Sequence, residues 1–159
     1  MNNKKKILVL CTGNSCRSIM AEGLINHFGK DDFQAFSAGS KPTGYVHPMS
    51  LKTLKKSGIF KTDYKSQSWD EFRDINFDLV ITVCDNAAGE SCPVYLSSTP
   101  KVHWGVEDPA KFKGSEEEIE NEFQRIFTIL AKRTHAMVEK YSDTKKFQIE
   151  ELNVIGNLV

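Results

Sequence analysis

The stretch that decides the fold runs from Ile7 to Ser18 and reads Ile7-Leu8-Val9-Leu10-Cys11-Thr12-Gly13-Asn14-Ser15-Cys16-Arg17-Ser18. Its first four residues form an unbroken aliphatic run, which predicts a central strand of a parallel sheet that is buried on both faces. After Arg17, apolar residues recur at helical spacing, and Gly29 stands where a helix C-cap belongs. The stretch therefore predicts a strand, a short loop and a helix in that order.

Apolar segments continue at intervals that suit alternating strands and helices. The sequence predicts further strands over residues 33–37, 79–83 and 102–104, a helix over 48–57, and a long amphipathic helix that begins after Ser115. Ser115 and Glu118 have the spacing of a capping box at the start of that helix. We interpret the five glutamates between Glu116 and Glu122 as a solvated first turn, favoured by the helix dipole, and not as a metal site.

This order of elements indicates an α/β fold. Right-handed crossovers turn it into a single doubly wound four-stranded parallel sheet, in the flavodoxin-like order 2-1-3-4, with helices on both faces. In that order the first and third strands are neighbours, and ligands bind at their carboxyl ends. We therefore expect Cys11, Cys84 and Asp108, which each follow a predicted strand, to converge on one rim of the sheet.

Length and charge limit the classes of function. The 159 residues fit one domain, which we place at 1–141, and a C-terminal extension, 142–159, of unknown role that we expect to be a helix packed on the domain or on a partner. The 21 basic and 21 acidic side chains cancel, which argues against a nucleic-acid binder. No apolar run approaches the roughly 20 residues of a membrane span, and no signal-peptide pattern is present. We expect a cytoplasmic protein, in which four cysteines indicate reactive or metal-binding thiols instead of a disulfide framework.

The loop after the first strand has the properties of an oxyanion site. A short loop that curls into a helix N-terminus directs successive N–H groups at one centre, where the helix dipole also favours negative charge. Gly13 and Asn14 tolerate the left-handed backbone that such a curl requires, and Arg17 offers a planar fork for two oxygens. A Walker loop is excluded because no Gly-Lys-Ser/Thr follows. The predicted oxyanion-binding residues are Thr12, Gly13, Asn14, Ser15, Cys16, Arg17 and Ser18.

Cys11 stands at the entrance of this loop and experiences the same field. A fall of its pKa from about 8.5 to about 6 would raise the thiolate fraction at pH 7 from a few per cent to about nine tenths. We predict Cys11 as a nucleophile and Ser18 as a hydrogen-bond donor to its thiolate. Cys16 is interpreted as a structural or protective thiol. The alternative for Cys11 is an inert apolar residue at a strand end.

These residues resemble a known family. Cys11, five intervening residues and Arg17-Ser18, with Asp108-Pro109 late in the chain, resemble the low-molecular-weight protein tyrosine phosphatases over roughly residues 5–140. The continuation into Met20-Ala21-Glu22-Gly23, and His103-Trp104-Gly105 ahead of Asp108, resemble the arsenate reductase branch more closely. The resemblance implies that Arg17 binds the oxyanion and that Asp108 protonates the leaving group.

Reduction of arsenate to arsenite takes two electrons, which two thiols supply when they form a disulfide. Cys84 qualifies as the second thiol through the adjacency of its strand to the first, and Cys92 follows eight positions later across small and polar residues. The resemblance implies that Cys11 attacks arsenate, that Cys84 displaces arsenite by forming a disulfide, and that Cys92 carries the disulfide to an external thiol reductant. The alternatives are a buried apolar role for Cys84 and a chance loop cysteine at Cys92, or a zinc site, which the cysteine spacing does not favour.

Two departures from the family pattern bear on partners and cofactors. The interval from Cys84 to Cys92 is one residue longer than the thioredoxin-coupled pattern, so thioredoxin and a glutathione and glutaredoxin system both remain open as the reductant. Asn14, Glu22 and Ser37 match potassium ligands of some relatives, but Ser66-Gln67-Ser68 replaces the expected Thr-Ser-Asp. We expect no metal and no cofactor, with potassium as the one candidate that the partial match leaves.

Two other functions are compatible with the same residues. The first is a low-molecular-weight phosphatase that hydrolyses phosphate monoesters, with the distal thiols as bystanders. The second is a non-catalytic oxyanion or redox sensor. Phosphatase relatives commonly have aromatic residues just after Asp-Pro to grip a phosphotyrosine ring, whereas Ala110-Lys111-Phe112 follows here. The sequence therefore favours a small inorganic substrate and predicts an arsenate reductase.

Overall fold

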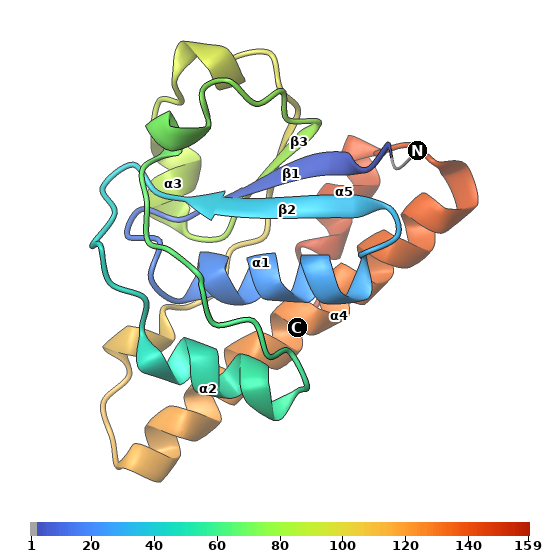
Figure 1. The fold of residues 1–159 in the computed structure, drawn as a ribbon. Helices are drawn as coiled ribbons and strands as arrows, with labels where there is room; N and C mark the ends of the chain where they lie inside the picture. The colour runs from blue at the N-terminus through green and yellow to red at the C-terminus, as the bar shows by residue number, and fades with distance from the viewer. Residues whose placement is uncertain (1–2) are drawn as a thin grey trace.

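The computed structural model describes residues 3–159, which form one parallel sheet with helices packed around it (Figure 1). The strands are β1 (Lys5–Leu10), β2 (Phe33–Ala38), β3 (Leu79–Thr82) and β4 (Lys101–His103). The helices are α1 (Arg17–Phe28), α2 (Pro48–Lys56), α3 (Asp85–Gly89), α4 (Glu116–Thr144) and α5 (Ile149–Ile155). Short 3-10 turns are η1 (Trp69–Phe72), η2 (Val94–Leu96) and η3 (Pro109–Lys111).

The sheet has the order β2-β1-β3-β4, and every neighbouring pair is parallel, so the predicted order is confirmed. Leu10 lies opposite Ala38 and Thr82, and Thr82 lies opposite His103. All four strands therefore end at the same edge, on the left in Figure 1, where α3 also lies. The residues that follow these strands make the site described below.

The core lies between the sheet and the helices. The aliphatic run of β1 is 0–1% exposed, as predicted for a central strand. Helix α1 lies below β1 and β2 in Figure 1 with α4 behind it, and its residues Ser18 to Ala21 and Gly23 to Ile25 are all buried. At Gly23 a Cβ would lie 2.7 Å from Leu54 Cδ2 of α2, so glycine lets these two helices approach.

The predicted helix starts are formed by local hydrogen bonds. Ser115 Oγ accepts a bond from the Glu118 N–H (3.2 Å), and Glu118 Oε1 accepts one from the Ser115 N–H (3.0 Å), which completes the capping box. Helix α2 begins at Pro48, and His47 Nδ1 caps it by accepting from the Met49 N–H (3.1 Å). The glutamates that follow Ser115 form the first turn of α4, as predicted.

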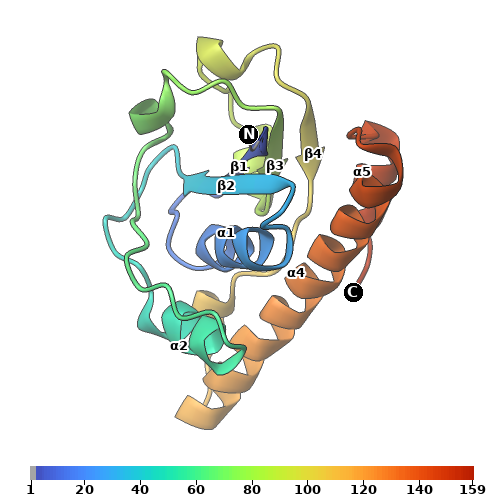
Figure 2. The same ribbon diagram turned by 45° about the vertical axis from the view of Figure 1, so that its right-hand side comes forward.

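The C-terminal residues form α5, which packs beside β4 and α4 (Figure 2). The indole of Trp104 donates to the Leu152 carbonyl (2.9 Å), and the His103 N–H donates to Asn153 Oδ1 (3.2 Å). The extension thus packs on the rest of the chain. Helix α4 runs through the predicted boundary at Tyr141 as far as Thr144. The predicted domain 1–141 also includes residues 1 and 2, which lie outside the described part.

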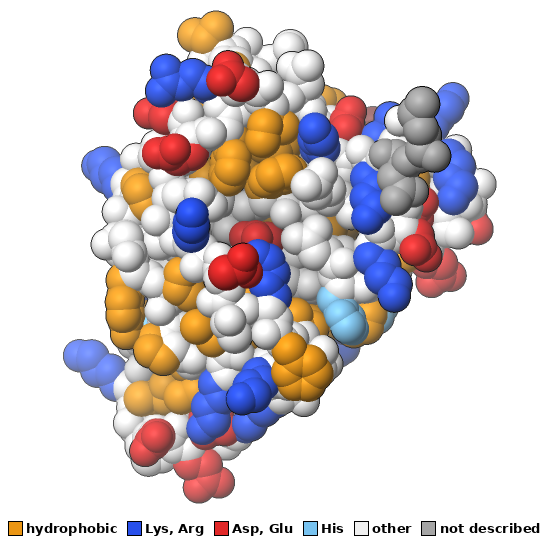
Figure 3. Space-filling model, in the orientation of Figure 1, with side chains coloured by type: hydrophobic (Ala, Val, Ile, Leu, Met, Phe, Trp, Pro, Cys, Tyr) orange, Lys and Arg blue, Asp and Glu red, His pale blue; other side chains and the backbone are white. Residues whose placement is uncertain are grey.

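The helices and the surface bear on binding to membranes and to polyanions. In residues 3–159, none of the helices combines the length and the apolar character needed to cross a bilayer. On the face in Figure 3, basic and acidic side chains are interspersed, and neither sign dominates. This mixture agrees with the equal numbers of basic and acidic residues in the sequence.

Candidate active site

Residues 11–18, which we call the anion loop, connect β1 to α1 and turn their carbonyl groups outward. The N–H groups of Lys41, Thr43 and His47 donate to the carbonyls of Thr12, Gly13 and Ser15, at 3.0, 3.0 and 3.1 Å. In a trans peptide the next N–H points opposite to the carbonyl. The N–H groups of residues 13, 14 and 16 therefore point toward the inside of the loop, as a site for a tetrahedral oxyanion requires.

The left-handed turn of the loop is made by Asn14, whose φ is 47°. Gly13 does not adopt this conformation, and its carbonyl accepts from the Thr43 N–H (3.0 Å) and from the Ser66 hydroxyl (3.1 Å). Asn14 is fully buried, and its amide nitrogen donates to Ser18 Oγ at 2.8 Å. No bond between Ser18 and Cys11 is present in residues 3–159, so Ser18 supports the loop through Asn14.

The side chain of Arg17 spans the mouth of the anion loop. Its Nη1 donates to the Val106 carbonyl (3.0 Å), and its Nη2 lies 3.6 Å from Asp108 Oδ2. Its buried Nε has no acceptor within residues 3–159, so this N–H remains available to an oxyanion. Arg17, Asp108, Cys84 and Phe112 line one cavity of about 450 Å³. The structure therefore brings the predicted arginine and acid together at the loop.

Cys84 lies against Cys11, as the adjacency of β1 and β3 predicts. The two thiols are close enough to shift each other's pKa, and both residues are about 5% exposed or less. Cys84 is the N-cap of α3, and its Sγ accepts from the N–H groups of Ala87 and Thr12, each at 3.4 Å. All four cysteines are free thiols. Two thiols therefore meet at one end of the oxyanion cradle.

The contact shifts the pKa values of the two thiols in opposite directions. The hydrogen bond from Cys11 and the N–H groups of Thr12 and Ala87 lower the pKa of Cys84 to about 5. The same bond to Cys84, followed by burial, raises the pKa of Cys11 by more than the charge of Arg17 lowers it. This differs from the expected low pKa of Cys11, because the neighbouring Cys84 and burial both disfavour the Cys11 thiolate. Burial raises the pKa of Cys16 to about 11.

Cys92 takes no part in these bonds. It follows α3, is half-buried, and lines a second cavity of about 450 Å³ together with Ala87, Glu90 and Val102. The structure thus brings together Cys11, Arg17, Cys84 and Asp108 and leaves Cys92 beside them on the adjoining segment.

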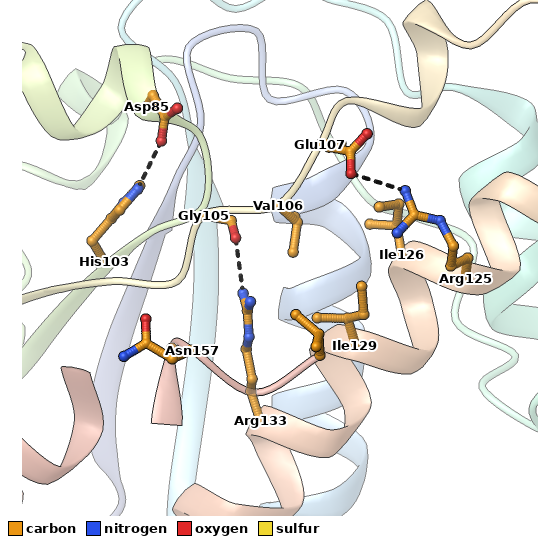
Figure 4. Close-up of a pocket in the computed structure, with 12 residues that line it drawn as sticks. Asp85, His103, Gly105, Val106, Glu107, Arg125, Ile126, Ile129, Arg133 and Asn157 are labelled. Atoms are coloured by element: carbon orange, nitrogen blue, oxygen red, sulfur yellow. Dashed lines mark hydrogen bonds and ion pairs between the residues drawn. The ribbon is translucent and has the colours of Figure 1, made fainter. Parts of the chain in front are cut away.

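Sequence reasoning missed several contacts of that segment. Asp85, the first residue of α3, lies 3.0 Å from His103 Nε2, and His103 Nδ1 shares a hydrogen bond with Thr82 Oγ1 (2.8 Å). Figure 4 shows this pair at the edge of a cavity of about 410 Å³, with Arg133 bonded to the Gly105 carbonyl. At the other end of the segment, Glu90 reaches the anion loop. The one signal for Glu90 in the sequence is that its carboxylate stands alone among small residues.

The residues matched to potassium ligands bond to one another. Ser37 Oγ donates to Glu22 Oε1 (2.5 Å) and accepts from Asn14 Nδ2 (3.0 Å), while Asn14 Oδ1 accepts from the Gln67 N–H (2.8 Å). Asn14 therefore presents nitrogen toward Ser37, whereas a hard cation needs several converging oxygens. These polar groups are therefore engaged with one another in this structure. Within residues 3–159, no group of three or more His, Cys, Asp or Glu side chains is arranged to hold a metal.

Comparison with known proteins agrees with this geometry. Residues 6–147 match the family described as low molecular weight phosphotyrosine protein phosphatase. The chain belongs to this family. Among curated relatives, the arsenate reductase of Halalkalibacterium halodurans is 41% identical over 137 residues, which are 86% of this chain and 97% of that protein.

Two further relatives of this phosphatase family point the same way. The arsenate reductase of Bacillus subtilis is 38% identical over 135 residues, which are 85% of this chain and 96% of that protein. A solved structure described as an arsenate reductase in the phosphate binding state aligns with a TM-score of 0.71 at 27% identity, and covers 86% of this chain and 98% of that one. This chain thus shares the fold of that arsenate reductase over most of its length.

Proposed function

We propose that this chain reduces arsenate to arsenite with thiols as the source of electrons. The observation that carries the proposal is the position of Cys84 against the anion loop, where its sulfur accepts a hydrogen bond from the N–H of Thr12, the residue after Cys11 (3.4 Å). Hydrolysis of a phosphate ester needs one thiolate, whereas a two-electron reduction needs two thiols that can reach each other. Similarity to curated arsenate reductases over most of the chain supports the same assignment.

In the proposed first step, the N–H groups of the anion loop and the Arg17 guanidinium hold arsenate, and the sulfur of Cys11 attacks arsenic. The proton of the Cys11 thiol passes to the neighbouring Cys84 thiolate, whose pKa is lowered. One arsenate oxygen leaves as water, with Asp108 as its proton donor, and a sulfur–arsenic bond forms. Asp108 is suited to this role because it lies beside Arg17 at the mouth of the loop.

In the second step, the Asp108 carboxylate, which lines the same cavity, takes the proton of the Cys84 thiol, and the Cys84 sulfur attacks the Cys11 sulfur. The sulfur–arsenic bond breaks, and its electron pair remains on arsenic, which leaves as arsenite. Two thiols have then become one disulfide, and arsenate has gained two electrons. Cys92 next attacks Cys84 and releases Cys11 as a thiolate. An external thiol system, either thioredoxin or glutathione with glutaredoxin, reduces the disulfide between Cys84 and Cys92.

The test measures arsenite formed from arsenate, with each reductant system supplied separately. We expect turnover by the wild type, no turnover by Cys84→Ser, and one equivalent of arsenite per protein from Cys92→Ser, with a disulfide between Cys11 and Cys84 trapped. Ser91→Ala is the matched control, since Ser91 is exposed beside Cys92, and it should keep wild-type turnover. Sustained arsenite formation by Cys84→Ser would overturn the relay.

Hydrolysis of phosphate monoesters is a second candidate activity for the same cavity. The contact between Arg17 and Asp108 supports it, because an oxyanion grip beside a proton donor is what ester cleavage requires. Under this alternative, Cys84→Ser keeps aryl phosphate hydrolysis and Cys11→Ser loses it. A wild type that hydrolyses aryl phosphate but forms no arsenite would make the phosphatase the principal activity.

A further inference from the structure

Glu90 lies between Cys84 and Cys92 in the chain, yet its carboxylate turns back to the anion loop. The hydroxyl of Thr12 donates to Glu90 Oε1 at 2.9 Å, and the hydroxyl of Ser40 donates to Glu90 Oε2. Thr12 follows β1 and Ser40 follows β2, so the carboxylate joins two neighbouring loops at the rim of the sheet. The three side chains are far apart in sequence, and only the fold brings them together.

Thr12 also contacts Cys84. Its N–H donates to the Cys84 sulfur (3.4 Å), and its hydroxyl oxygen lies 3.7 Å from the same sulfur. One residue of the anion loop therefore holds Cys84 through its backbone and Glu90 through its side chain. These contacts restrain both ends of residues 84–92, which we call the relay segment.

Few other contacts restrain the relay segment. Its helix, α3, has five residues, of which only Ala87 is buried. A helix this short has almost no stability of its own. The side-chain bonds at its ends, from Asp85 to His103 and from Glu90 to the loop, are thus its main restraints besides the Cys84 contacts. Because the bonds to Glu90 involve a charged acceptor, they are among the stronger hydrogen bonds.

We propose that Glu90 is a positioning residue for thiol exchange, which keeps Cys84 against Cys11 while docked on Thr12 and Ser40, and which must release both hydroxyls before Cys92 can reach Cys84. The inference rests on the proposed function. It follows because α3 separates the two cysteines in the docked segment, and its far end is fixed by Glu90. Release of that end frees the residues that carry Cys92.

Loss of the carboxylate should have opposite effects on the rate of disulfide formation and on the rate at which Cys92 is alkylated. In Glu90→Ala, we expect the disulfide between Cys11 and Cys84 to form about tenfold more slowly in a single turnover, since Cys84 is less well held. In the same variant, Cys92 should be alkylated about tenfold faster in the reduced protein. The KM for arsenate should change little, because the Glu90 carboxylate takes no part in binding the oxyanion.

The experiment combines these rates with amide hydrogen exchange of residues 85–90, all in the full-length reduced protein. Glu90→Gln keeps one acceptor oxygen and should fall between Glu90→Ala and the wild type, and Ser40→Ala should do the same because one donor remains. Ser91→Ala is the control for the segment and should match the wild type. Thermal melting of each variant identifies a loss of folding, and Glu90→Gln then carries the test.

The two proposals fail in different ways. Alkylation of Cys92 and amide exchange need no arsenate, so they report on Glu90 even if the wild type forms no arsenite. The role of Glu90 would be overturned if Glu90→Ala left the alkylation of Cys92 and the amide exchange unchanged. It would also be overturned if the variant slowed both disulfide formation and the alkylation of Cys92. Absence of arsenite from the wild type would overturn the proposed function and leave the alkylation result to be judged alone.

Discussion

The anion loop and the relay segment each bring a cysteine to the same rim of the sheet, but they are held in different ways. The loop is fixed by backbone bonds from residues 41–47 to its carbonyls, and Cys11, Asn14 and Cys16 are buried. The relay segment is largely exposed and depends on a few side-chain contacts. The comparison indicates that oxyanion binding is built from backbone, whereas disulfide transfer depends on single side chains that substitution can remove.

The largest effect is expected from a substitution of Arg17, whose guanidinium is the side-chain group proposed to bind the oxyanion. Arg17→Lys removes the planar fork that reaches Val106, Asp108 and an oxyanion together. We expect kcat/KM for arsenate to fall about 10³-fold, because a lysine cannot bond two oxygens in parallel. Steady-state kinetics and calorimetric phosphate binding measure the loss. Near-normal kinetics in this variant would mean that the backbone N–H groups suffice.

The second prediction concerns Glu22, which supports the loop through Ser37 and Asn14. Burial raises the pKa of Glu22 from 4.5 to about 7, so the folded protein keeps a proton there that the unfolded chain loses. The resulting stability is fully present below about pH 4.5 and is lost as the pH rises through about 7. Glu22→Gln should remove this slope and gain up to about 3 kcal/mol at the alkaline end.

Denaturant unfolding across that pH window provides the measurement. The outcome that contradicts the prediction is a parallel pH dependence in the two proteins, which would mean that Glu22 is ionised in the folded state.

A pair of glycine substitutions compares the two regions directly. A Cβ at Gly39 would lie 2.7 Å from the Cys11 carbonyl and also meet the Thr12 carbonyl, whereas one at Gly89, in α3, meets nothing within 4 Å. Gly39→Ala should therefore displace the loop, lower stability by about 2 kcal/mol and weaken phosphate binding. Gly89→Ala should stabilise α3 by up to about 1 kcal/mol. Thermal melts measure the stability of the two variants, and titrations measure their phosphate binding. Equal effects of Gly39→Ala and Gly89→Ala would contradict this prediction.

The smallest effect is a titration at the point where the two regions meet. In the wild type, thiolate absorbance at about 240 nm should appear with a midpoint near pH 5, the pKa of Cys84. Cys11→Ala removes the bond that contributes most to this low pKa, so the midpoint should move upward. An unmoved midpoint would show that the backbone N–H groups alone set the charge on Cys84.

The sequence was sufficient to predict features with a local or periodic signal. The aliphatic runs of β1 and β3 identify buried strands, the capping box identifies the start of α4, and strand adjacency brings Cys84 to Cys11. The remaining features depend on geometry across long separations. The link from Glu90 to Thr12 spans 78 positions, and the N–H of Thr12 favours charge on Cys84 across 72. No pattern within either segment specifies these contacts.

The short helix α5 affects the tendency of this protein to aggregate. Edge strands expose unpaired peptide groups, which can form hydrogen bonds with a strand of a second chain. In β4 the outward N–H of His103 is instead occupied by Asn153, and Gly156 lies so close that a Cβ there would be 2.5 Å from the His103 carbonyl. The family match ends at residue 147, so α5 lies beyond it. A chain trimmed there would uncover this edge and become prone to aggregation.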